Sequence, residues 1–154
     1  MLENYLAAFQ NKRLNEVIIP GSHDAGIYGE GKQNVITQKL DIEGQAMSGV
    51  RWFDLRIAVH KSGFGPWAKY EQRAYHLDQS LVRNESHAIR RHLPGGDKAV
   101  KSHQNVSHLG GWGDSLQAMI AQARVFLGVH KTEFLIFKFS KCYGLDQIVE
   151  TCVD

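Results

Sequence analysis

The segment from residue 50 to residue 60, VRWFDLRIAVH, constrains the fold more strongly than any other part of the chain. Its apolar residues recur at every second position, which predicts a β-strand whose two faces differ. One face is mostly apolar and suits burial against helices. The other face carries an acid and a base two residues apart on an otherwise apolar side. The predicted faces are Arg51, Phe53, Leu55, Ile57 and Val59 on the first, and Val50, Trp52, Asp54, Arg56 and Ala58 on the second.

Other segments of the chain have the patterns of short strands. A continuous β-branched run at Val17–Ile19 predicts a first strand that is buried on both sides. The sequence RAYHL at 73–77 predicts a brief third strand, and EFLIFKFSK at 133–141 predicts the last one. The residues after 141 are expected to form only a short tail.

Helical spacing of apolar residues predicts the elements between these strands. An amphipathic helix is expected near the start, where Leu2, Leu6 and Phe9 share one face, and another at about 38–47, ending near Ser48 and Gly49. The clearest helical pattern covers 113–131 and has Asp114 or Ser115 as its N-cap.

Strands that alternate with helices predict parallel pairing and an α/β architecture in a single domain. The chain has 154 residues, of which 43% are hydrophobic and 22% charged, as is common for globular proteins. The formal net charge of +2 does not favour binding to a nucleic acid, and aromatic residues are not interleaved with the residues of the basic stretch. No apolar run approaches the roughly 18 residues that span a bilayer, and the first residues lack the pattern of a signal peptide.

Groups that can exchange protons or bind anions follow or lie on the predicted strands. His23 and Asp24 come after the first strand, Asp54 and Arg56 lie on the second, and His76 lies near the end of the third. Functional groups of parallel α/β folds gather at the carboxyl ends of the strands. Two histidines, two carboxylates and an arginine suit acid–base catalysis on a phosphate, since each imidazole can be oriented by a carboxylate and the arginine can bind phosphoryl oxygens.

Simpler interpretations of the same residues remain open at this point. A histidine after a strand is commonly a hydrogen-bonded loop residue, and Asp54 with Arg56 could form a buried salt bridge. A further group of histidines suggests a metal site only weakly, because no cysteine or acidic residue accompanies them in a ligand pattern. These histidines are His87, His92, His103 and His108.

The motifs together resemble the catalytic X region of the phosphatidylinositol-specific phospholipases C. The resemblance rests first on VIIPGSHDAGIY at 17–28 and on GVRWFDLR at 49–56. It continues through AYHL at 74–77 and, more by pattern than by identity, through 109–141. It implies a TIM-type (β/α) barrel, and a reaction in which the inositol 2-hydroxyl attacks phosphorus to release diacylglycerol and a cyclic inositol phosphate.

The resemblance also implies roles for individual residues. His23 matches the general base, His76 the general acid, and Asp24 the carboxylate that supports the acid. Arg56 matches the phosphate-stabilising arginine of the bacterial, metal-independent branch, whereas the calcium-dependent branch has a carboxylate there. We therefore expect no metal and no other cofactor.

Three further residues are expected to bind substrate. Asp54 is one of them. Ser140 matches a polar position at the end of a family strand, and Lys138 on the same face, or Lys141, can supply positive charge.

The chain matches only about half of such a barrel, which typically has eight strands and about 250 residues. We therefore expect residues 1–154 to form the N-terminal half of an X-like domain, to lack the carboxylate that orients the base histidine, and to be weakly stable and weakly active alone. A missing C-terminal half or a partner chain would complete it.

The expected partner is phosphatidylinositol or a related lipid, which the protein would reach by peripheral contact with a membrane surface. The family is commonly secreted, but no signal peptide is recognised. The alternatives are a non-catalytic module that binds inositol-lipid headgroups and a phosphodiesterase for another lipid.

Overall fold

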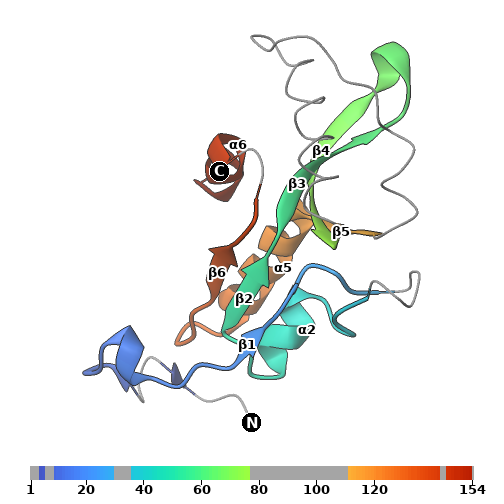
Figure 1. The fold of residues 1–154 in the computed structure, drawn as a ribbon. Helices are drawn as coiled ribbons and strands as arrows, with labels where there is room; N and C mark the ends of the chain where they lie inside the picture. Colours follow the sequence, from blue (N-terminus) through green and yellow to red (C-terminus); the bar gives the residue numbers. More distant parts are fainter. Residues whose placement is uncertain (1–3, 6–8, 30–35, 77–110, 143–144, 154) are drawn as a thin grey trace.

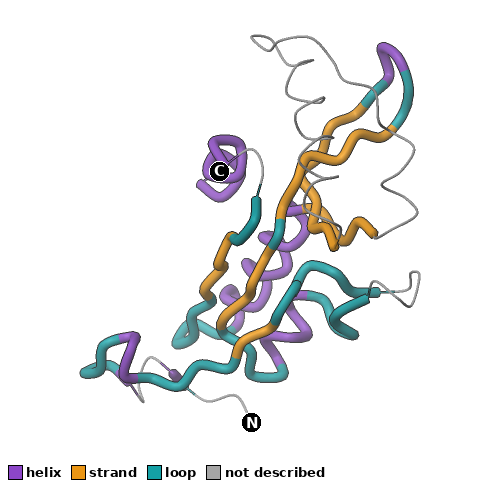
Figure 2. The backbone as a smooth tube through the Cα atoms, in the orientation of Figure 1, coloured by secondary structure: helices purple, strands orange, loops and turns teal. Residues whose placement is uncertain are grey.

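In the computed structural model, the described residues form two small β-sheets and three α-helices. The strands and helices are shown in Figures 1 and 2. No helix among the described residues is both long and apolar enough to cross a membrane. The structure describes residues 4–5, 9–29, 36–76, 111–142 and 145–153.

The first sheet is parallel and has the strand order β1–β2–β6. β1 is Gly21–Ser22, β2 is Trp52–Leu55 and β6 is Ile136–Phe139. The register places Phe53 beside both Ser22 and Phe137, so β2 is the central strand. All three carboxyl ends therefore meet at one edge of the sheet.

The second sheet is antiparallel, which the sequence did not predict. Its order is β3–β4–β5, formed by Ile57–Ser62, Lys69–His76 and Gly111–Ser115. The chain reverses between β3 and β4 within 63–68, and so short a connection can join only antiparallel strands. Parallel pairing is thus confirmed between the predicted strands at 50–60 and 133–141, which contain β2 and β6, and is wrong for β3 and β4, which overlap the predicted strands at 50–60 and 73–77.

The predicted strand at 50–60 is divided between the two sheets at Arg56. β2 runs almost straight into β3, with a short break between them in Figure 2. The predicted alternation is largely present, because Phe53, Leu55 and Ile57 are fully buried whereas Asp54 and Arg56 are partly exposed. The break therefore places an arginine where the two sheets meet.

Helices cover the apolar face of the central strand (Figure 1). α2 (Ile42–Met47) begins at Asp41, whose side chain accepts a hydrogen bond from Gly44 N, and is followed by Gly49 with a φ of 102°. α5 (Leu116–Val129) begins at Ser115, one of the two predicted caps, because the Ser115 hydroxyl accepts a hydrogen bond from Ala118 N. Side chains from α2, α5 and β2 form one core, with Ile42, Ala46, Phe53, Leu55, Leu116, Met119 and Phe126 almost completely buried.

Two predictions near the ends of the chain were wrong. Val17–Ile19 is not a strand, and Ile18 is 92% exposed. Pairing with the 50–60 segment starts only at Pro20, whose carbonyl accepts hydrogen bonds from Arg51 N and Trp52 N, so the β-branched run lies before the sheet begins. The residues after 141 include a helix, α6 (Leu145–Val153), which contacts α5 and buries Ile148. The predicted N-terminal helix rests on Leu2 and Leu6, which lie outside the described residues.

A buried ion pair lies beneath the parallel sheet. The Arg51 side chain is fully buried, and its Nε donates to Glu133 Oε2 at 2.8 Å. Its Nη1 donates to the carbonyls of Ala46 and Val50, and its guanidinium carbon lies 4.9 Å from the centre of the Phe126 ring. The sequence pattern placed Arg51 correctly on the buried face without indicating its partner.

The chain combines helices and strands, but no closed barrel forms among the residues that the structure describes. The half-barrel remains a prediction.

Candidate active site

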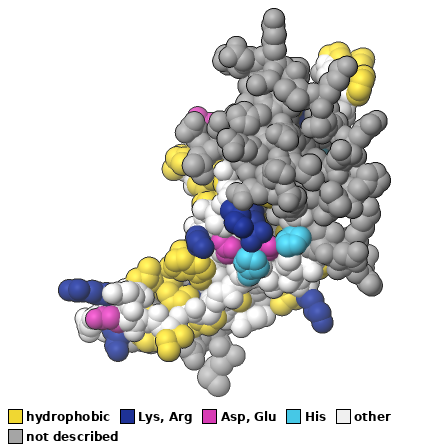
Figure 3. Space-filling view, in the orientation of Figure 1, with side chains coloured by type: hydrophobic (Ala, Val, Ile, Leu, Met, Phe, Trp, Pro, Cys, Tyr) yellow, Lys and Arg dark blue, Asp and Glu magenta, His cyan; other side chains and the backbone are white. Residues whose placement is uncertain are grey.

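Charged side chains gather where the carboxyl ends of the parallel strands meet the second sheet. Figure 3 shows them as one group of histidine, acidic and basic side chains on the surface of the molecule. His23 and Asp24 follow β1, Asp54 lies on β2, Arg56 joins β2 to β3, and His76 ends β4. Lys138 on β6 and Ser140 just after it complete the group. All seven side chains that the sequence singled out are therefore brought together.

Asp24 occupies the centre of this group. Its carboxylate is fully buried, with Oδ2 at 2.7 Å from His76 Nδ1 and Oδ1 at 2.9 Å from Arg56 Nε. The contact with Arg56 is an ion pair without hydrogen-bond alignment. A buried carboxylate is costly unless it is compensated, and here two cationic or protonatable groups compensate it. The φ of Asp24 is 47°, in the left-handed region that non-glycine residues rarely adopt.

Polar side chains hold the backbone around Asp24. The Thr37 hydroxyl donates to Asp24 O at 2.7 Å. Gln45 on α2 is buried, and it accepts from the Ser22 hydroxyl at 2.6 Å while its amide donates to Ala25 O at 2.9 Å. Gln38 donates to His23 O at 2.8 Å. These residues were not predicted from the sequence, although a glutamine between the buried positions of α2 was a usable signal.

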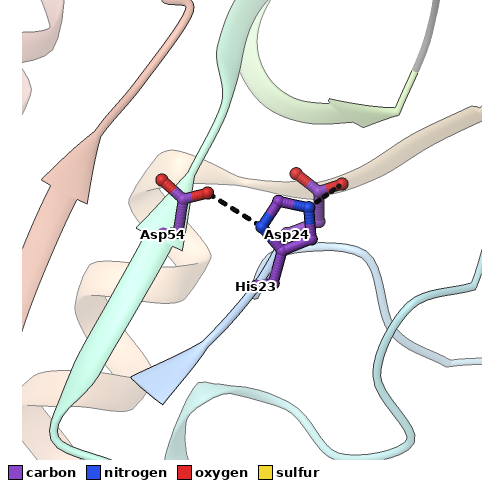
Figure 4. A group of neighbouring side chains, drawn as sticks. All are labelled: His23, Asp24 and Asp54. Atoms are coloured by element: carbon purple, nitrogen blue, oxygen red, sulfur yellow. Dashed lines mark hydrogen bonds and ion pairs between the residues drawn. The ribbon is translucent and has the colours of Figure 1, made fainter.

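His23 lies between Asp54 and Asp24, as Figure 4 shows. Its Nδ1 is 3.1 Å from Asp54 Oδ2, and its Nε2 is 3.3 Å from Arg56 Nη2. A carboxylate accepts hydrogen bonds and a guanidinium donates them, so this network assigns the proton to Nδ1 and leaves the lone pair on Nε2. The His23 ring is 67% exposed, so Nε2 is a base that a ligand can reach.

The carboxylate that orients His23 was expected to lie outside this chain, and that expectation was wrong. Asp54 lies within the chain and contacts His23 Nδ1, and its expected role in substrate binding stays a prediction. The expectation of a carboxylate outside the chain failed for a geometric reason. β1 and β2 are neighbouring strands, and Asp54 faces the end of β1. No ion pair links Asp54 to Arg56, so the alternative of a salt bridge between these two residues is also wrong.

His76 uses its Nδ1 for Asp24, which leaves Nε2 as the ring atom that can give a proton to a ligand. Its side chain is 41% exposed. His23 Nε2 also lies 3.5 Å from the same Asp24 oxygen. The two histidines are therefore neighbours around one buried carboxylate.

Asp54 is held in its charged form by its surroundings. Burial raises the pKa of its carboxyl group, but this effect is outweighed by the hydrogen bond from Ser140 and the positive charge of Lys138, and the pKa falls below its ordinary value. The Ser140 hydroxyl donates to Asp54 Oδ1 at 2.6 Å, and Lys138 Nζ lies 3.6 Å from the same oxygen. Lys138 and Ser140 share a face of the last strand, as predicted, and both contact Asp54.

Replacing Ser140 by alanine should raise the pKa of Asp54, because the carboxylate loses a hydrogen bond that favours its charged form. A pKa lowered by folding contributes stability above the unfolded value of 3.8, and that stability is lost as the pH falls through the folded-state pKa. The Ser140→Ala variant should therefore be less stable than the original chain near neutral pH and approach it in acid. A ¹³C NMR titration of the Asp54 carboxyl carbon measures the shift. Ser48→Ala at the end of α2 is the control, and an unchanged Asp54 pKa would contradict the assignment.

A metal ion is the other ligand this group could hold. His23, Asp24 and Asp54 each offer a ligand atom, and these atoms lie within 4.8 Å of one another. However, Asp24 is already paired with Arg56, and Asp54 with Lys138. A divalent cation would have to displace or lie beside these positive charges. Arg56 and Lys138 balance the charges of Asp24 and Asp54, so these four side chains present no net negative charge to a bound anion.

The histidines at 87, 92, 103 and 108, which suggested a metal site weakly, lie outside the described residues.

Compared with known proteins, the chain matches no family model, no curated protein and no solved structure. The geometry of this site is therefore the basis for inferring a function.

Proposed function

We propose that this chain carries the catalytic half of a phosphodiesterase of the phosphatidylinositol-specific phospholipase C type, and that it works without a metal ion. One observation supports this most strongly. Two histidines each contact a different carboxylate, His23 with Asp54 and His76 with Asp24, and Arg56 lies against both His23 and Asp24. Intramolecular phosphodiester cleavage uses a general base and a general acid, and a carboxylate partner can orient each imidazole.

The reaction begins with proton removal by His23. Its Nε2 accepts the proton of the inositol 2-hydroxyl, and the resulting alkoxide forms a bond to phosphorus. Asp54 and Asp24 then stabilise the imidazolium, at 3.1 Å from Nδ1 and 3.5 Å from Nε2. As the bond from phosphorus to the diacylglycerol oxygen breaks, the Nε2 proton of His76 moves to that oxygen. The products are diacylglycerol and a cyclic inositol phosphate.

Arg56 stabilises the charge that develops on the phosphoryl oxygens. Its Nε is used by Asp24 and its Nη2 lies near His23, so the guanidinium is fixed beside both histidines. A fixed cation at the place where charge develops lowers the barrier without having to reorganise. Arg56 therefore supplies here the positive charge that a bound cation provides in metal-dependent phosphodiesterases.

The test is to incubate the purified chain with phosphatidylinositol vesicles and a chelator, and to follow the products by ³¹P NMR. We expect the resonance of a cyclic inositol phosphate, lost in His23→Ala and in His76→Ala. His130→Gln at the end of α5 is the matched control, because this histidine packs on Phe126 and lies outside the site. Product that forms only after calcium is added would contradict the metal-independent mechanism. Vesicle binding by the folded chain without product would contradict catalysis and favour a headgroup-binding module.

A further inference from the structure

Two large aromatic side chains project from the tip of the β3–β4 hairpin. Phe64 is 89% exposed and Trp67 is 81% exposed. Figure 1 shows the hairpin extending away from the helices, and Figure 3 shows apolar surface at its tip. Folding normally buries such side chains, and apolar groups gathered on a protruding element commonly mark an interaction surface.

The turn that carries these aromatics has a fixed conformation. Gly63 and Gly65 have φ values of 80° and 57°, and the 3₁₀ turn Gly65–Trp67 includes Pro66. Trp67 N donates to Phe64 O, and Ala68 N donates to Gly65 O, each at 3.2 Å. A Cβ atom at position 63 would lie 2.7 Å from Trp67 O, so the turn requires glycine there. The aromatics are therefore already arranged, and little conformational entropy would be lost when they bind.

Positive charge surrounds the aromatic tip. Residues 61–70, KSGFGPWAKY, contain two lysines and no acidic residue. Lys61 lies opposite Tyr70, and Lys69 lies opposite Ser62, so the two lysines are on opposite faces of the hairpin. An apolar tip with a cation on each face of the hairpin matches a planar anionic surface into which the tip inserts. A groove on a protein would instead contact one face of the hairpin.

We propose that the tip of this hairpin inserts into the surface of an anionic lipid bilayer. Phe64 and Trp67 enter the boundary between headgroups and acyl chains, where tryptophan is favoured. Lys61 and Lys69 remain at the level of the headgroups and interact with their negative charge. The tip is a surface separate from the candidate active site, and its binding to lipid does not require that site to be catalytic.

Sedimentation with lipid vesicles tests this proposal without any turnover. The vesicles contain phosphatidylcholine and phosphatidylglycerol and no inositol lipid, so failure here and failure of the proposed catalysis are distinguishable. We expect the double variant Phe64→Ser/Trp67→Ser to bind at least about tenfold more weakly, because the apolar surface available for burial is lost. Lys61→Gln/Lys69→Gln should lower affinity for these vesicles and reduce its salt dependence. Ile18→Ser is the control, because it changes a side chain that is 92% exposed but lies outside the hairpin, and this variant should bind normally.

Vesicles containing brominated lipid give a second measurement that does not depend on affinity. Bromine quenches tryptophan fluorescence on contact, so the original chain should be quenched and Trp67→Phe should lose most of that quenching while remaining bound. Equal binding by the Phe64→Ser/Trp67→Ser variant would overturn the proposal. A change in its oligomeric state by light scattering, without an effect on vesicle binding, would also overturn it and identify the tip as an interface between copies of the chain.

Discussion

Replacing Asp24 by asparagine should slow phosphodiester cleavage by about 10²- to 10⁴-fold, the range that a general acid contributes. The substitution keeps the size of the side chain but removes its charge. Asp24 Oδ2 is 2.7 Å from His76 Nδ1, and its Oδ1 is 2.9 Å from Arg56 Nε. An amide cannot accept from both nitrogens, so one of these contacts would become a repulsion between two donors. His76 would lose the partner that fixes its tautomer, and Arg56 its counter-charge.

The leaving group provides a sharp control for this prediction. An inositol phosphodiester of nitrophenol needs no protonation of its leaving oxygen, so the loss in Asp24→Asn and in His76→Ala should shrink with that substrate. The loss in His23→Ala should remain large, because proton removal from the attacking hydroxyl is still required. Equal losses for Asp24→Asn with both substrates would contradict a role for Asp24 in proton donation. The circular dichroism spectrum checks that each variant is folded.

Replacing Arg51 by alanine should destabilise the fold by roughly 3–5 kcal/mol, the usual effect of breaking a buried ion pair. The side chain of Glu133 is only 4% exposed in the original chain, and its Oε2 would lose its partner. The hydrogen bonds to the carbonyls of Ala46 and Val50 would be lost as well. Urea denaturation followed by circular dichroism measures the change as a lower midpoint.

Two controls separate the missing charge from the missing volume. The double variant Arg51→Met/Glu133→Leu removes both charges and should recover much of the stability, because apolar residues of similar size can replace a buried pair. Glu71→Ala breaks the ion pair between Glu71 and Arg73, whose side chains are 49% and 32% exposed, and should cost about 1 kcal/mol or less. If Arg51→Ala had an equally small effect, the buried pair would not be stabilising the fold.

The sequence predicted the local features of the fold well. The two-residue period of the 50–60 segment placed Phe53, Leu55 and Ile57 in the core and the acid and base on the other side, because successive side chains of a strand must alternate. Ser115 was one of two residues predicted to cap the helix, because the side-chain oxygen of a serine or an aspartate can satisfy a free backbone amide. The run Val17–Ile19 was misjudged because β-branched residues favour extended backbone whether or not a neighbouring strand is there to pair with them.

The contacts within the site were harder to predict because they join distant residues. His23 and Asp24 are adjacent in the sequence, yet each has its shortest side-chain contact elsewhere, His23 with Asp54 and Asp24 with His76. The resemblance to the phospholipases implied the second pair, and these side chains are in contact. The first pair depends on the register between β1 and β2, which no local pattern encodes.

The backbone of Asp24 has a consequence for how such a site is held together. Its left-handed conformation costs roughly 1–3 kcal/mol, and its side chain is fully buried. A glycine at this position would relieve the backbone, but Arg56 would lose its counter-charge and His76 its partner. The left-handed backbone of the first loop and the positions of Arg56 and His76 therefore depend on the same carboxylate, so position 24 links the local fold to the arrangement of the site.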